Sequence, residues 1–221
     1  MRYYLLAEAT EKKATGVLGP QCMAFPKDHN LDWYESPSSM TKLNNKVFPT
    51  DETEFLFELD EHAILTDFIS QAIIPARGFL ISNKAKQVLS QFNLLEHKFY
   101  PATIISKKNQ ISYFWLHLID SKYGLINFTR SIFYEGFAPG WKQKDFHIKD
   151  TEDFLMLYEQ DIRPVIWAEK LYFLDSFTDK KPDMFVFSLL HNNAFVSYSV
   201  ITAFQKAGIT GYQAKEQEII I

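Results

Sequence analysis

The sequence predicts an α+β protein, with a mixed or mostly antiparallel sheet and helices packed on it. Three observations predict this class. Short apolar runs are separated by turn residues, the amphipathic helical segments are short, and two segments repeat at an offset of 115 residues. Short helices need a sheet to cover. We therefore expect a single α+β domain over residues 1–221, with an internal strand–helix–strand duplication and pseudo-repeat halves at 1–104 and 105–221.

Strands are expected at 3–7 and within 51–61, where apolar residues alternate with charged ones as in an exposed edge strand. Residues 63–74 predict a helix that ends at Pro75. Their apolar residues fall at i, i+3, i+4 and i+7, which is one face of a helix. These residues are Leu65, Phe68, Ile69 and Ala72.

The second half of the chain predicts further strands around one helix. A helix capped by Asp150 or Thr151 runs to about Ile162, with acidic residues in its first turn, where the helix dipole favours them. Residues 120–124 are expected to turn between two strands, and 135–150 to form a loop. The expected strands are 111–119, 125–133, 171–174 and 184–189.

The repeat consists of a short apolar strand, a capped helix, a left-handed turn and a second strand. Ser82 and Ser197 end the first strands and would cap the helices. Asn93 corresponds to Gly208, and both residue types suit the left-handed turn that closes a helix. Coincidence between two ordinary amphipathic helices is the alternative. The matching helix positions are Ala85, Val88, Leu89 and Phe92, and Val200, Ala203, Phe204 and Ala207.

Two stretches resemble a bacterial immunity-protein family of polymorphic toxin systems, immunity family eleven, formerly a domain of unknown function. The first is Gly-Phe-Leu-Ile-Ser-Asn-Lys-Ala-Lys-Gln-Val-Leu at 78–89, followed by Phe-Tyr-Pro-Ala at 99–102. The second is Phe-Val-Ser at 195–197, with Ala-Gly-Ile-Thr-Gly-Tyr at 207–212. The resemblance covers residues 55–215. It implies a cytoplasmic protein that neutralises a cognate toxin by stoichiometric binding, and it supplies no catalytic residues.

Composition is that of a folded protein without a nucleic-acid or membrane surface. Hydrophobic residues make up 47% and charged residues 23%, which excludes disorder for most of the chain. The formal net charge is −4, whereas nucleic acids and anionic membranes attract a positive field. The N-terminal apolar run is broken by Glu8, and no run reaches the roughly 18 residues that span a bilayer.

Motifs for catalysis, metals or cofactors do not stand out. The six histidines show no metal-ligand spacing, so we expect no metal and no cofactor. Cys22 is the single cysteine, which fits a reducing compartment, and its neighbours carry no positive charge to lower its pKa. A small cytoplasmic hydrolase or transferase with an unrecognised active site is the alternative function. A structural or regulatory interaction module is the third.

The expected partner surface has two candidate parts. Residues 51–61 carry six acids and no lysine or arginine, and an acidic surface would steer association with a basic toxin. A solvated face is the simpler explanation of that run. Trp141 lies on a loop rich in glycine and proline, where an aromatic residue would suit an interface, unless it folds back over the core. The expected contact residues are Asp51, Glu52, Glu54, Glu58 and Trp141.

Overall fold

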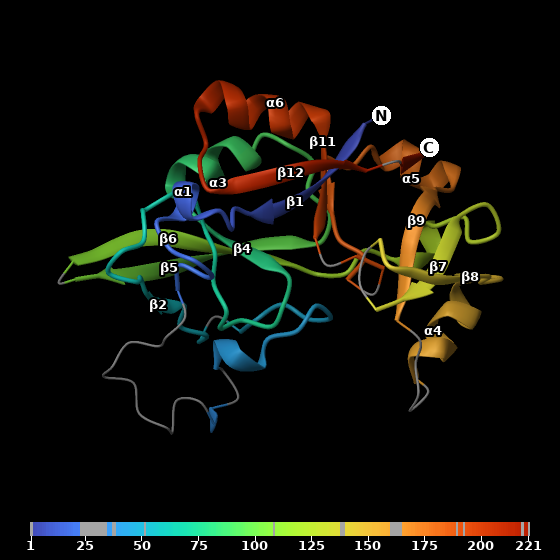
Figure 1. Ribbon diagram of the computed structural model, residues 1–221, viewed down its shortest axis with the longest axis horizontal. Coiled ribbons are helices and arrows are strands. Elements are labelled where there is room, and N and C mark those ends of the chain that lie inside the picture. Colours follow the sequence, from blue (N-terminus) through green and yellow to red (C-terminus); the bar gives the residue numbers. More distant parts are fainter. Residues whose placement is uncertain are drawn as a thin grey trace.

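The computed structural model describes residues 2–220, except 23–34, 37–38, 51, 108, 138–139, 160–164, 189, 192 and 218. It contains three β-sheets with helices against them, so the expected α+β class is confirmed (Figure 1). Antiparallel pairing dominates, as expected, and within the described part of the chain only two strand pairs are parallel. Within the described residues, no helix has the length and apolar character to cross a membrane.

The first sheet has the strand order β2-β5-β6-β4-β3. Its long hairpin, β5 and β6, pairs His97 with Leu118 at one end and Ser106 with Asn109 at the other. Helix α3 (Asn83–Leu89) connects β4 to β5. The strands are β2 (Leu56–Glu58), β3 (Phe68–Ile69), β4 (Gly78–Ile81), β5 (His97–Ser106) and β6 (Asn109–Leu118).

The second sheet has the order β10-β11-β1-β12, and helix α6 (Tyr198–Ala207) connects β11 to β12. Every strand pair in it is antiparallel. The central strand β1 comes from the N-terminus, although its neighbours come from the C-terminal part of the chain. The strands are β1 (Tyr3–Glu8), β10 (Met184–Phe185), β11 (Ala194–Ser197) and β12 (Tyr212–Gln217).

These two sheets share one topology and one register. We call β3, β4, α3, β5 and β6 the first unit, and β10, β11, α6, β12 and β1 the second unit. In the first, Ile81 lies opposite Phe114 and His97 opposite Leu118. In the second, Val196 lies opposite Tyr4 and Tyr212 opposite Glu8. Strand β1 therefore takes the place of β6, and the division expected between residues 104 and 105 falls inside β5.

The third sheet, of order β13-β9-β7-β8, lies at the opposite end of the molecule from the long β5–β6 hairpin (Figure 1). It is formed mainly by the chain that joins β6 to β10. Helices α4 and α5 accompany it. The elements are β7 (Ile132–Gly136), β8 (Lys142–Phe146), α4 (Thr151–Glu159), β9 (Ile166–Tyr172), α5 (Asp175–Lys180) and β13 (Ile219–Ile220).

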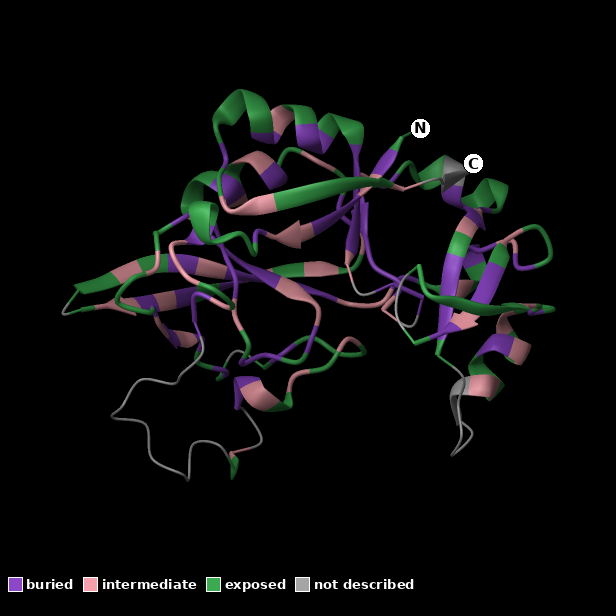
Figure 2. Ribbon diagram, viewed as in Figure 1, coloured by how far each residue is buried: buried purple, intermediate pink, exposed green. Residues whose placement is uncertain are grey.

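The two units share one hydrophobic core, which lies between their sheets and helices (Figure 2). Phe68 of the first unit packs edge-on against Phe204 of the second, with ring centroids 5.4 Å apart. A second core lies on the other face of the first sheet around Trp115, and a third, rich in phenylalanine, joins the second and third sheets. The shared core therefore takes side chains from both units.

The helix expected at 63–74 is wrong, because this segment contains strand β3 instead. Leu65 is 44% exposed, whereas Phe68 and Ile69 are both fully buried and enter two different cores. Consecutive residues that point to opposite faces define a strand. The apolar spacing matched a helix only because residues of two separate cores fell on one helical face.

The strand expected at 125–133 is also wrong. A 3-10 turn at Tyr123–Leu125 follows β6, and β7 then begins at Ile132 in a different sheet. The loop expected at 135–150 contains strand β8, whose side chains are mostly exposed and polar, so that no apolar alternation marked it. The helix expected after Asp150 is confirmed as α4, and the Asp150 carboxylate accepts a hydrogen bond from the Asp153 N–H at 2.9 Å.

The strand–helix–strand repeat is present in both units. The Ser82 and Ser197 hydroxyls accept hydrogen bonds from the backbone N–H groups of Ala85 and Val200, so both caps formed as expected. The first helix ends at Leu89, earlier than its expected end at Phe92. Gly208 closes the second helix with a φ of +63°, which is the left-handed conformation expected there. The same expectation for Asn93 is wrong, because Asn93 has no positive φ and the residue that caps the first helix, Ser90, has a right-handed conformation.

Candidate functional site

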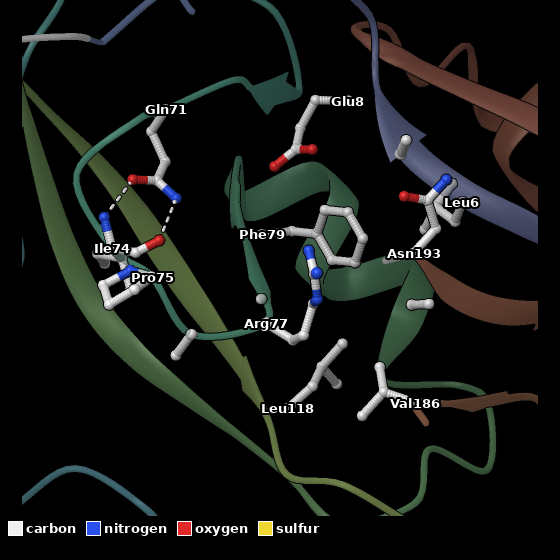
Figure 3. A pocket seen from close by; sticks show the side chains of 14 residues that line it. Leu6, Glu8, Gln71, Ile74, Pro75, Arg77, Phe79, Leu118, Val186 and Asn193 are labelled. Carbon is white, nitrogen blue, oxygen red and sulfur yellow. Dashed lines mark hydrogen bonds between the residues drawn. The ribbon is translucent and has the colours of Figure 1, made fainter. Parts of the chain in front are cut away.

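A polar pocket of about 170 Å³ opens where the two units meet (Figure 3). The end of β1 and the start of β11 form one side, and the segment from Ile74 to Phe79 with the end of β6 forms the other. Its apolar wall consists of Leu6, Phe79, Leu118 and Val186, and its polar side chains are Glu8, Gln71, Arg77 and Asn193.

Glu8 is the titratable acid of this pocket. It is the last residue of β1 and is partly buried, with its carboxyl group facing Phe79 and Arg77 in Figure 3. Burial raises the pKa of Glu8 to about 7, although the nearby Arg77 charge and its own backbone act to lower it. A carboxyl group with a pKa near neutrality can donate or accept a proton, or can bind a cation.

Arg77 supplies the positive charge of the pocket. Its backbone carbonyl accepts a hydrogen bond from Leu118 N–H at 3.0 Å, which ties the residue to the end of β6. Burial lowers the pKa of the Arg77 guanidinium, and the charges of Glu8 and Asp120 act in the opposite direction. The guanidinium nevertheless stays protonated at any physiological pH, since its ordinary pKa lies far above that range.

Gln71 shapes the pocket instead of offering a free polar group. Its Oε1 atom accepts hydrogen bonds from the N–H groups of Ile73 and Ile74, both at 2.7 Å, and its Nε2 donates to the Ile74 carbonyl (Figure 3). These bonds fix the turn that leads into Arg77. Glu8 and Asn193, by contrast, have no side-chain hydrogen bond to any other described residue (Figure 3).

A second candidate surface is the hydrophobic tip, which we define as Phe137, Trp141 and Val165 at the end of the third sheet. Their exposed fractions are 78%, 73% and 50%. Trp141 therefore does not fold back over the core. Val165 lies next to Gly136 across the sheet, because its carbonyl accepts the Gly136 N–H at 3.0 Å.

The base of the hydrophobic tip is firmly held. The indole N–H of Trp167 donates to the Gly136 carbonyl at 3.1 Å, and the Gly140 N–H donates to the Tyr134 hydroxyl at 2.6 Å. A Cβ atom on Gly136 would lie 2.1 Å from the Trp141 carbonyl oxygen, so only glycine fits there. Hydrogen bonds thus hold the backbone at Gly136 and Gly140, next to the two aromatic residues.

The expected acidic residues lie elsewhere. Glu52 and Glu54 are exposed and precede β2, and Glu58 is half-buried in that edge strand. Asp51 lies outside the described residues. Figure 1 places β2 far from β7 and β8, so the structure does not bring these acids and Trp141 onto one surface.

Cys22 is unsuited to nucleophilic catalysis. Its side chain is fully buried, and burial raises the pKa of its thiol to about 12, which keeps it protonated at neutral pH. His117 and His191 are buried as well, and His117 accepts the Trp115 indole N–H at 3.2 Å. Among the described residues, no cluster of three or more His, Cys, Asp or Glu side chains could hold a metal ion.

Neither a scan of protein-family models nor a search of curated proteins gives a match for this chain. The motifs that resemble the immunity family lie in β4–α3 and in β11–α6 with the turn after it. These are equivalent parts of the two units, so the resembling motifs belong to the duplicated strand–helix–strand scaffold.

The sequence analysis missed Glu8, Arg77, Asn193 and Phe137 as site residues. Glu8 carried one signal, since it is an acid directly after an apolar strand. Arg77 and Asn193 precede strands that are far apart in the chain, and only the pairing of those strands with β6 and β1 brings them to one pocket.

Proposed function

We propose that this protein is a cytoplasmic immunity protein that binds a cognate bacterial toxin and inhibits it stoichiometrically. The resemblance of its repeated motifs to such a family suggests the partner class. The observation that carries the proposal is the hydrophobic tip, where two large aromatic side chains are exposed next to backbone positions that hydrogen bonds hold.

Binding at the tip would be favoured by the burial of its large apolar side chains. Burying one large apolar side chain contributes about 1.5–3 kcal/mol, and Trp is strongly enriched among residues that dominate binding energy. Because Trp167 and Tyr134 already hold Gly136 and Gly140 by hydrogen bonds, these two positions lose little conformational freedom on association.

Strand β8 extends this surface. Among the described residues it pairs with β7 alone, so its other backbone edge is open to a strand from a partner. Lys142 bridges Asp145 and Glu169 at 2.6 and 3.0 Å, and Lys144 pairs with Glu135 at 3.0 Å. Such charges on an edge strand hinder indiscriminate pairing between copies.

The acidic residues of the β2 region have a separate role in this proposal. Glu52, Glu54 and Glu58 would attract a basic toxin at long range without touching it at the tip. Charge reversal of all three should lower the association rate, and the effect should shrink at high salt, because steering is screened beyond about 8–10 Å. An unchanged association rate would remove this role and leave the tip as the contact surface.

The direct test needs a cognate toxin domain, which is to be sought among the genes adjacent to the gene of this protein. The wild-type chain should protect cells that express this domain and should form an equimolar complex in light scattering. Phe137→Ala with Trp141→Ala should raise the Kd at least about 30-fold, as expected when a residue worth about 2 kcal/mol is lost. Leu18→Ala is the matched control, since Leu18 is 82% exposed but lies outside the tip. Full affinity in the double variant would reject the tip.

The alternative function, a small hydrolase or transferase, is favoured by one observation, the near-neutral pKa of Glu8 in a pocket. Protection by binding should survive Glu8→Gln, Cys22→Ala, His117→Gln and His191→Ala in folded protein, because no bond is made. Loss of protection in one of these variants, with toxin binding unchanged, would favour enzymatic detoxification instead.

A further inference from the structure

Equivalent residues of the two units line the pocket together. Glu8 on β1 and Leu118 on β6 occupy equivalent positions. Glu8 lies opposite Tyr212 on β12, and Leu118 lies opposite His97, the equivalent residue on β5. Ala194 and Phe79 are equivalent in the same way, since Ala194 lies opposite Leu6 on β1 and Phe79 lies opposite Leu116 on β6. Both members of each pair line the pocket (Figure 3).

The two units contribute different chemistry at these equivalent positions. The first unit presents the apolar Phe79 and Leu118, and the second presents Glu8, with Asn193 just before β11. If the contact between the two units served only to hold them together, apolar side chains would fill it from both sides, as they fill the shared core. Glu8 stands where the other unit has Leu118, so it gives this wall of the pocket an acceptor group that a leucine lacks.

We propose that this pocket binds a small aliphatic amino acid as a zwitterion. Arg77 lines the pocket and supplies the positive charge with which a carboxylate would pair. Glu8 and the amide oxygen of Asn193 are acceptors for an ammonium group. Leu6, Phe79, Leu118 and Val186 form the apolar wall for an aliphatic side chain.

The size of the pocket limits the ligand. A volume of about 170 Å³ is close to that of cavities that hold a molecule of benzene size, about six to eight non-hydrogen atoms. Alanine and valine fall in or near this range. A nucleotide or a peptide is too large to enter as a whole.

Ligand binding should be coupled to the ionisation of Glu8. Burial raises the pKa of this carboxyl to about 7, because the nearby Arg77 charge offsets only part of the cost of desolvation. Arg77 in the pocket and Tyr212 opposite Glu8 on β12 are the ionisable groups that face it. A bound ammonium would add positive charge, lower the pKa of Glu8 and release a proton near pH 7. Affinity should therefore rise with pH between 6 and 8.

Isothermal titration of the full chain tests this inference. The probes are the common amino acids, each at up to about 10 mM, with isobutylamine and isobutyrate as probes that each lack one charged group. We expect at least one small aliphatic amino acid to bind with proton release at pH 7, and the two single-charge probes to bind at least about tenfold more weakly.

Variants then assign the contacts. Glu8→Gln and Glu8→Leu should each weaken binding at least about tenfold and abolish proton release, and Arg77→Met should weaken it similarly. Glu216→Gln is the control, because Glu216 is an exposed acid on β12 whose nearest partner is Arg2 at 3.8 Å. Absence of binding by every amino acid to the folded wild type would overturn the inference, as would binding that Glu8→Gln and Arg77→Met leave intact. These outcomes do not depend on toxin binding, because toxin affinity is measured separately.

Discussion

Asp67 and Asp183 occupy equivalent positions in the two units and hold equivalent serines. The Ser82 hydroxyl donates to Asp67 Oδ1 at 2.6 Å, and the Ser197 hydroxyl donates to Asp183 Oδ1 at 2.7 Å. In both units the serine backbone N–H also donates to the aspartate carbonyl, at 2.8 Å. Each aspartate thereby fixes the serine that caps the helix of its own unit.

The second carboxylate oxygen of each aspartate reaches into the other unit. Asp67 Oδ2 accepts the Thr210 N–H at 3.0 Å, just after α6, and Asp183 Oδ2 accepts the Asn93 N–H at 3.1 Å, after α3. The same arrangement therefore occurs twice. In each case one aspartate joins the start of the helix of its own unit to the turn that follows the helix of the other unit. This reciprocal pair of contacts fixes how the units meet, and with it the shape of the pocket.

Removal of Asp67 should be more costly than removal of Asp183. Asp67 has a side chain that is only 11% exposed and also pairs with Lys84 at 2.9 Å. Asp67→Ala leaves several polar groups unpaired and should lower the free energy of unfolding by roughly 3 kcal/mol, whereas Asp183→Ala should cost about half as much. Denaturant titration measures both. Equal small losses would show that the reciprocal contacts are not structural.

Leu89 and Phe204 are equivalent core residues of the two helices, and both are fully buried. Replacing either with alanine should lower the free energy of unfolding by roughly 2–5 kcal/mol, because a cavity opens in the shared core. Lys206→Ala, an exposed change on α6, should have almost no effect. A loss under about 1 kcal/mol for Leu89→Ala or Phe204→Ala would contradict their place in a common core.

His191 should make the protein sensitive to acid. Burial and the charges of Arg77 and Lys215 lower the pKa of His191 to about 4. In the unfolded chain its pKa is near 6.5, so the unfolded state binds the proton first and stability falls as the pH drops from about 6.5 towards 4. Between pH 7 and pH 5 this loss is roughly 2 kcal/mol.

His191→Phe tests this dependence, because phenylalanine cannot take up a proton. Its free energy of unfolding should change about 2 kcal/mol less between pH 7 and pH 5 than that of the wild type. His62→Gln is the control, as His62 is exposed. If the wild type and His191→Phe lose stability in parallel, His191 is not the group responsible.

Glu8 should have the opposite pH dependence. Its folded-state pKa of about 7 lies above the ordinary value of 4.5, so the native state holds its proton more tightly. The contribution of Glu8 to stability is therefore full below about pH 4.5 and is lost as the pH rises through 7. Glu8→Gln should stabilise the protein relative to wild type at pH 8, by up to about 3 kcal/mol more than at pH 4. Equal shifts at the two pH values would show that Glu8 is freely hydrated.

Local features were predictable from the sequence wherever a single segment carries its own signal. The serine caps and Gly208 were predicted because each stabilises the helix next to it through a bond or a backbone conformation of its own. The edge strand β2 was predicted because Phe55 and Phe57 face the core while Glu54 and Glu58 do not. Helix α4 was predicted from Asp150 and the acids after it.

Other features depend on which distant segments meet. The sequence alone determined the duplicated strand–helix–strand scaffold, because caps and apolar spacing are local. Only the tertiary structure decided that β3 is a strand, since Phe68 and Ile69 are buried in two different cores. It also decided that β1 completes the second unit, which places Glu8 beside Arg77. Pairing across more than a hundred residues is fixed by hydrogen bonds and burial that no local pattern encodes.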